Sequence, residues 1–172
     1  KKKKNAINKT LFGLRKEKKK KIVKKLDRPT PFTQSGFIVK KSITSKLLGI
    51  LKIQELRAAY LGFQIDGGVR QGTPNVAVPF TKNTRLNKFG NVAGKRSGLI
   101  KKNTQFQGTI NGVEGIYQRM KNNKVKLLHG LETHVTYKPK FPFFKIGKGY
   151  INSKFNKNLD EKIKKEIARA KW

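Results

Sequence analysis

The sequence predicts an α+β fold, in which a small antiparallel β-rich body, a sheet or a sandwich, lies between a basic N-terminal helix and an amphipathic C-terminal helix. Apolar residues recur at helical spacing over residues 5–26 and again after residue 148, and short alternating runs separated by Gly and Asn turns fill the middle. A chain of 172 residues with 35% hydrophobic content suits one modest core. We therefore expect a single domain, 1–172, made of a helix 1–27, a body 28–146 and a helix 147–172.

The first expected helix covers 5–26 and ends near Asp27. Its apolar stripe is interrupted once, by Lys18, and consists of Ile7, Leu11, Leu14, Ile22 and Leu26. Pro29 and Pro31 push the residues before them to extended geometry and give the helix a rigid exit. Lysines cover most of the exposed circumference of its second half, which is either a solvated face or an arm that faces a polyanion.

The first half of the body is expected to contain two strands and a long loop. Residues 36–42 and 47–53 predict the strands, and 55–65 is ambiguous, although alternation near its end favours a third strand. Gly, Pro, Asn and Thr then predict a loop over 67–94 with one short strand at 75–80. Ordered loops of this length are uncommon unless they hold an interface or a site. The residues expected at a subunit interface are Asp66, Gly67, Gly68, Arg70, Pro79 and Arg85.

The second half of the body predicts a meander. After a helical turn at 98–102, the expected strands are 105–110, 115–120 and 124–128, followed by an extended segment at 133–138. The aromatic and proline run from Pro139 to Phe144 is expected to seal one end of the core. A helix then begins at Lys148 or Tyr150, and its apolar face consists of Ile151, Phe155, Leu159, Ile163 and Ile167.

The charge of the chain is extreme, because 42 Lys and Arg against 9 Asp and Glu give a formal net charge of +33. Self-repulsion on this scale calls for a polyanionic partner or acidic neighbouring subunits. The excess of Lys over Arg fits diffuse screening of nucleic acid better than sequence reading, and it also fits an AT-rich genome. The residues expected to contact DNA or another polyanion are Lys18, Lys19, Lys20, Lys21, Lys24, Lys25, Lys95 and Arg96.

The sequence has no cluster of residues typical of an enzyme, a metal site or a cofactor site. It has no Cys, and His129 and His134 beside Glu132 form at most a weak metal site and more simply have structural roles. Asp66 fits a turn, or pairing with Arg70, and other carboxylates form no acid/base pair. We therefore expect no catalytic residues, no metal and no cofactor.

Other short patterns carry little function. Residues 94–97 lack the spacing of a phosphate-binding loop, although their basic side chains could still meet a phosphate. Phe141–Phe144 and Tyr150 interleave with lysines as in single-strand binders, but they fit core packing better. No apolar run is long enough to span a bilayer, and no hydrophobic segment after Lys1–Lys4 makes a secretory signal. The absence of an initiator Met suggests that the sequence begins within a longer chain.

Four groups of segments follow one another in a recognisable order. They are Asp27–Thr33 after a basic helix; Arg57–Leu61 with Asp66–Arg70; Val78-Pro79 with Arg85–Asn91; and Gly115–Arg119 with Phe141–Gly147 before the terminal helix. In this order they resemble tailed-bacteriophage virion proteins related to minor tail protein Z and to tail-completion proteins. The segment between Arg70 and Val78 is shorter than the family's usual insertion, which leaves the contacts of this loop open.

The resemblance implies a structural virion protein at the head–tail connection (neck) or in tail completion. It implies a homo-oligomeric ring that contacts other neck, portal-adaptor or tail proteins, with packaged DNA nearby, no catalytic centre and no membrane. Such a protein would be assembled in the host cytoplasm and located in the virion. The alternative from composition is a ribosomal or other RNA-binding structural protein, and a nuclease is opposed by the scarcity of carboxylates.

Overall fold

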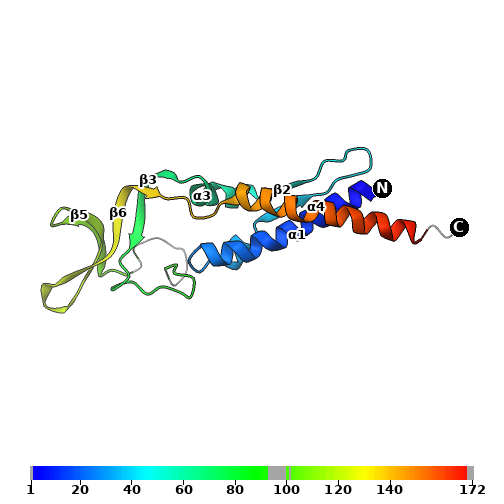
Figure 1. Cartoon of the computed structure of the whole chain (residues 1–172). Coiled ribbons are helices and arrows are strands. Elements are labelled where there is room, and N and C mark those ends of the chain that lie inside the picture. Colours follow the sequence, from blue (N-terminus) through cyan, green and yellow to red (C-terminus); the bar gives the residue numbers. More distant parts are fainter. Residues whose placement is uncertain (1, 93–99, 101, 170–172) are drawn as a thin grey trace. The chain divides into compact units, whose positions relative to one another are not determined.

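The computed structural model describes residues 2–92, 100 and 102–169. The chain divides into two compact units, which we call the helical unit (Lys1–Gly67 with Pro139–Trp172) and the sheet unit (Gly68–Lys138). The α+β class is confirmed, with antiparallel sheets and a helix towards each end of the chain (Figure 1). Where we expected one body over 28–146, its residues are shared between the two units.

The helical unit begins with α1 (Lys2–Lys25), which confirms the expected N-terminal helix. Its apolar stripe is buried at Ala6, Leu11, Leu14 and Ile22. One turn of helix, α2 (Pro31–Gln34), follows the prolines, and the Thr30 hydroxyl accepts a hydrogen bond from the Thr33 amide at its start.

The predicted strands near 36–42 and 47–53 are confirmed as β1 (Phe37–Lys40) and β2 (Ile50–Ile53), which pair antiparallel. The strand favoured within 55–65 is wrong, because this segment is a helix, α3 (Glu55–Ile65). Arg57 and Leu61 are its buried residues, one helical turn apart. The buried side chain of Arg57 donates from Nε to the Phe32 carbonyl at 2.6 Å, and its guanidinium lies 3.8 Å from the Phe32 ring centroid. Because one of the two buried positions of α3 is occupied by the charged Arg57, the pattern of apolar residues alone does not show the helical period.

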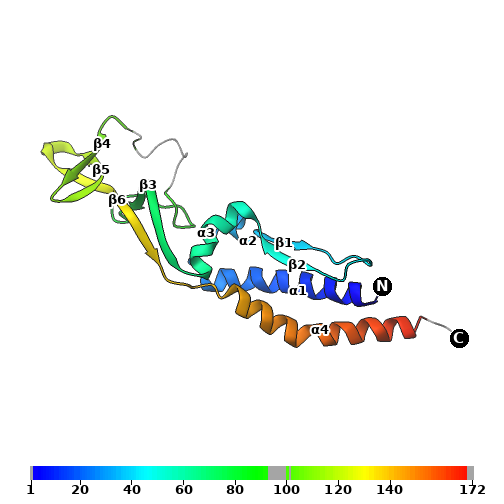
Figure 2. The same cartoon turned by 90° about the horizontal axis from the view of Figure 1, so that it is seen from above.

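The last helix, α4 (Phe143–Ile167), begins five residues before the expected Lys148, directly after Pro142. It lies antiparallel to α1, and Figure 2 shows the two side by side with the N and C labels at one end. Their contacts run in opposite senses along the two helices: Lys9 with Glu161, Thr10 with Asn158, Gly13 with Tyr150, and Lys18 with Phe143. The hydrogen bond from Lys9 holds the pKa of Glu161 below its usual range.

The core of the helical unit consists of Ile22, Phe37, Leu61 and Phe141, all fully buried. The Phe37 and Phe141 ring centroids are 6.1 Å apart. The expected aromatic seal is therefore formed by Phe141, with Phe143 packed against the core, while Phe144 is 74% exposed. No residue of α4 is fully buried, so its apolar face is only partly covered.

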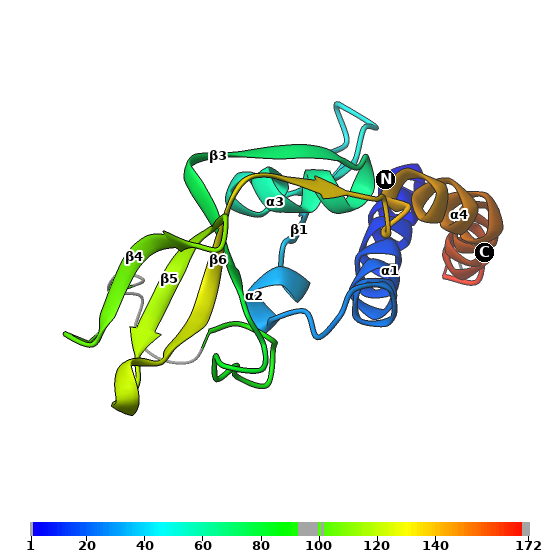
Figure 3. The same cartoon turned by 90° about the vertical axis from the view of Figure 1, so that its left-hand side faces the viewer.

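The sheet unit is a four-stranded antiparallel sheet in the order β3-β6-β5-β4 (Figure 3). The expected meander is confirmed by β4 (Gln105–Ile110), β5 (Val113–Arg119), the short helix η1 (Lys121–Asn123) and β6 (Val125–Tyr137). The side chains of Ile116, Tyr117 and Leu128 are buried in this unit. The helical turn expected at 98–102 lies mostly outside the described residues.

The short strand expected at 75–80 is confirmed as the end of β3 (Gly68–Pro79), but the loop expected before it is wrong, because this twelve-residue strand already begins at Gly68. It pairs antiparallel with β6, with an irregularity between Gln71 and Val76. β3 is an edge strand, and an edge tolerates Gly and Pro because one row of backbone donors needs no partner strand.

Candidate polyanion surface and apolar groove

The second half of α1 presents most of the lysines that we expected to contact a polyanion. Lys20, Lys24 and Lys25 are exposed, and Lys19 and Lys21 are half-buried. Basic residues in the last turn also interact favourably with the carbonyl end of the helix dipole. We call Lys19, Lys20, Lys21, Lys24 and Lys25 the α1 lysine cluster.

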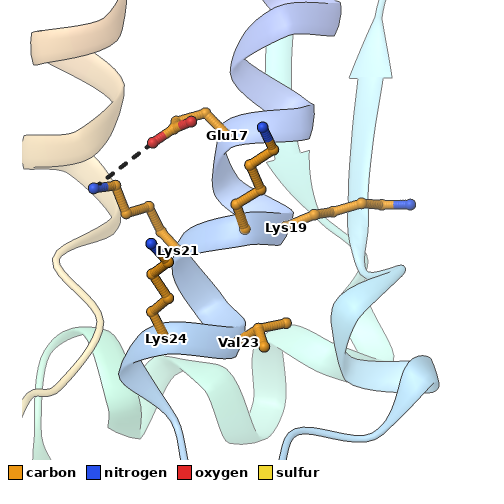
Figure 4. Close-up of a pocket in the computed structure, with 6 residues that line it drawn as sticks. Glu17, Lys19, Lys21, Val23 and Lys24 are labelled. Atoms are coloured by element: carbon orange, nitrogen blue, oxygen red, sulfur yellow. Dashed lines mark ion pairs between the residues drawn. The ribbon is translucent and has the colours of Figure 1, made fainter.

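A shallow depression of about 500 Å³ lies within this cluster and includes Glu17 and Val23 in its lining (Figure 4). Glu17 pairs with Lys21 at 3.7 Å. Lys21 and Lys24 extend to one side of the helix in Figure 4, whereas Lys19 extends to the other. Ammonium groups that diverge in this way do not converge on one phosphate, but they raise the positive potential around the whole helix.

Lys18 corrects the sequence-based expectation, because its side chain is fully buried and cannot face a polyanion. It lies on the apolar stripe, one turn from both Leu14 and Ile22. Its ammonium donates a hydrogen bond to the Phe143 carbonyl and lies 3.7 Å from the centroid of the Phe143 ring. Burial lowers the pKa of Lys18 from 10.5 to about 8.

Beside Lys18 lies an apolar groove between α1, β2 and α4, which we call the α1/α4 groove; the sequence did not predict it. Its volume is about 650 Å³. Its apolar lining consists of Leu11, Leu14, Ile50, Leu51, Phe143, Phe144 and Ile151. Three lysines, Lys18, Lys145 and Lys148, also line it, and none of its lining residues is acidic. The one sequence signal was a lysine within an apolar stripe.

The residues expected at a subunit interface do not lie in one loop. Asp66 ends α3, and the turn expected after it is present, since Gly67 and Gly68 have φ angles of 75° and 115°. Arg70 is exposed in β3, and Pro79 is its last residue. The segment after β3 is hydrogen-bonded to β6, because the Thr84 hydroxyl donates to the Leu128 carbonyl at 2.6 Å.

Arg85 follows Thr84 directly, and its side chain is exposed. Lys95 and Arg96 lie outside the described residues.

The two histidines of the sequence and Glu132 all lie on β6. His129 is buried in β6, and His134 and Glu132 are exposed on the same strand. No set of three or more His, Asp or Glu residues in the described part of the chain could hold a metal ion. Across those same ranges, no helix has the length and apolar character needed to cross a membrane.

Comparison of the chain with protein-family models, with curated proteins and with solved structures finds no match.

Proposed function

We propose that this chain is a non-enzymatic structural protein of a tailed-phage particle, which acts at the head–tail connection or in tail completion as one subunit of a ring-like oligomer. The observation that carries the proposal is the amount of apolar surface left uncovered. Among the described residues, ten apolar side chains are buried and nineteen large apolar side chains are exposed. Exposed apolar side chains that lie together are typical of a surface covered by a neighbour, and the ordered resemblance supplies the phage setting.

The loop between β1 and β2 is the most distinct part of this surface. Ile43, Leu47 and Leu48 are all about half exposed on it. The loop is held to α1, because the Asn8 side chain donates to the Ser42 carbonyl at 3.1 Å and accepts from the Ser42 amide at 2.8 Å. An apolar loop fixed in this way is pre-organised to contact a neighbouring subunit at a small entropic cost.

The charge supports a position near packaged DNA. With a net charge of +33, copies of the chain repel one another unless a polyanion or acidic neighbours are present. The α1 lysine cluster suits sequence-independent attraction to phosphates, because its ammonium groups diverge.

Two measurements test the proposal. Mass photometry and negative-stain imaging of the purified chain, with short duplex DNA, should show closed rings. Particles that lack the protein should join heads to tails when it is added. The double variant Leu47→Ser with Leu48→Ser should abolish both ring formation and the joining of heads to tails. The control Thr44→Ala, on the same loop, should leave both unchanged. A wild-type chain that stays monomeric and does not restore joining would refute the proposal.

The second candidate is a ribosomal or other RNA-binding structural protein. It is favoured by the divergence of the α1 lysines, since a helix with cations on several sides suits insertion into folded RNA. Co-sedimentation with ribosomes that survives high salt would favour this function, and release by moderate salt would oppose it.

A further inference from the structure

The α1/α4 groove combines an apolar floor, an uncovered apolar rim and a one-sided charge. Leu11 and Leu14 on its floor are buried, whereas Ile50, Phe144 and Ile151 at its rim are exposed. The rim is therefore positioned to be covered by an apolar surface from outside the unit.

The charge of the groove indicates what kind of surface would cover it. Lys145 and Lys148 are exposed in the first turns of α4, and the buried ammonium of Lys18 lies beside them. Among the described residues, ion pairs join Lys9 to Glu161, Lys21 to Glu17 and Arg28 to Asp27, and none of them includes a lysine of the groove. Electrostatic complementarity then favours an occupant that carries carboxylates.

Two other occupants fit less well. A second copy of the chain has 9 acidic residues among its 172, so it offers few carboxylates to the lysines of this groove. A single-stranded nucleic acid would need flat stacking surfaces, but the lining is mainly aliphatic, and Phe144 packs edge-on against Phe143 with ring centroids 5.3 Å apart.

We propose that the α1/α4 groove binds an acidic amphipathic helix of a different protein. The apolar side of that helix covers Phe144, Ile50 and Ile151, and its carboxylates meet Lys145 and Lys148. Helix-in-groove recognition reads anchors at i, i+3, i+4 and i+7, and the groove volume of about 650 Å³ is large enough for several such side chains. This inference goes beyond the proposed function and does not depend on it.

The test uses the full chain and a fluorescein-labelled synthetic peptide of about 16 residues, with Leu at the i, i+3, i+4 and i+7 positions and Glu on the opposite face. Fluorescence anisotropy should show saturable binding with one peptide per chain. Phe144→Ser should weaken it by about tenfold or more, as expected for an aromatic anchor. The matched control is Leu56→Ser, because Leu56 is equally exposed, at 73% against 74% for Phe144, and lies outside the groove.

A second pair of variants separates local from general charge. Lys145→Glu with Lys148→Glu should weaken peptide binding by about tenfold, and Lys154→Glu with Lys157→Glu on the same helix, outside the groove, should weaken it less than about threefold. Circular dichroism of each variant checks that it is folded.

Three results would overturn the inference. Equal binding of a control peptide with Ser in place of every Leu would mean that only charge is recognised. Displacement of the peptide by oligo(dT) from wild type but not from Phe144→Ser would assign the groove to single-stranded nucleic acid. Self-association of the chain that is lost in Phe144→Ser would assign it to a second copy.

Discussion

Replacing Lys18 by Met should stabilise the folded chain at pH 7. The shift of the Lys18 pKa from 10.5 to about 8 corresponds to a cost of about 3.5 kcal/mol for keeping this ammonium buried, at about 1.4 kcal/mol for each pH unit. Met fills the same space without a charge and adapts to irregular packing. It loses the hydrogen bond to the Phe143 carbonyl and the contact with the Phe143 ring, which together contribute about 1–2 kcal/mol. The net expectation is a gain of about 1.5–2.5 kcal/mol.

The pH dependence gives the sharper test. Below pH 8 Lys18 is protonated in both the folded and the unfolded chain, so the cost is fully present. Between pH 8 and 10.5 the folded chain has released this proton while the unfolded chain still binds it, so the wild type becomes more stable as pH rises. The advantage of Lys18→Met should therefore shrink from pH 7 to pH 10, and beyond pH 10.5 it should disappear or reverse.

Urea unfolding followed by circular dichroism at both pH values measures this difference directly. Lys20→Met is the matched control, because Lys20 is exposed on the same helix, and its effect should stay within about 0.5 kcal/mol. The reasoning is wrong if Lys18→Met has a lower free energy of unfolding than the wild type at pH 7 and if this difference is the same at pH 10. The buried ammonium would then not be a net cost to folding.

Three further outcomes are expected. A Cβ on Gly13 would collide with the Tyr150 hydroxyl, so Gly13→Ala should destabilise the chain by about 1–2 kcal/mol even though Ala has the better helix propensity. In a double-mutant cycle, Tyr150→Phe should restore part of this lost stability. Arg57→Lys should cost about 2 kcal/mol or more in urea unfolding, because an ammonium cannot stack and donate as the guanidinium does; an unchanged midpoint would contradict this. Changing Lys20 and Lys24 to Gln should reduce the slope of log K against log salt for duplex DNA by about 1–2, and an unchanged slope would remove α1 from the DNA-facing surface.

Local patterns were sufficient to predict α1 and the meander. The stripe of Leu11, Leu14 and Ile22 follows the helical period along α1, so periodicity alone identifies the helix. The strands β4, β5 and β6 follow one another through short turns, and neighbours in sequence are neighbours in the sheet.

The structures of α3 and β3 depend on contacts between residues far apart in the sequence, which the spacing of apolar residues cannot predict. α3 turns Arg57 inward because the Phe32 carbonyl and ring receive its guanidinium, and only the folded chain brings these groups together. β3 contains Gly and Pro that favour turns locally, and its pairing with β6 joins residues far apart in the sequence. Tertiary contacts therefore override local preference in both.

The candidate sites divide in the same way. The α1 lysine cluster was predictable, because exposed lysines need only a helix to place them. The α1/α4 groove was not, because its lining comes from three elements. Lys18 is the example. The sequence places it in a run of lysines expected to be exposed, whereas in the fold its side chain is buried and those of its neighbours are not.

The antiparallel pairing of α1 with α4 also sets an order for folding during synthesis. The two helices are separated by over a hundred residues, and the whole sheet unit lies between them. At about 5–20 residues per second, α1 waits roughly 6–24 s for α4 to be made. The sheet unit is continuous in sequence and has every strand available before then, whereas the apolar stripe of α1 lacks its partner until α4 has been made. α1 is thus made before the sheet unit, but it reaches its native environment only after the sheet unit has been made.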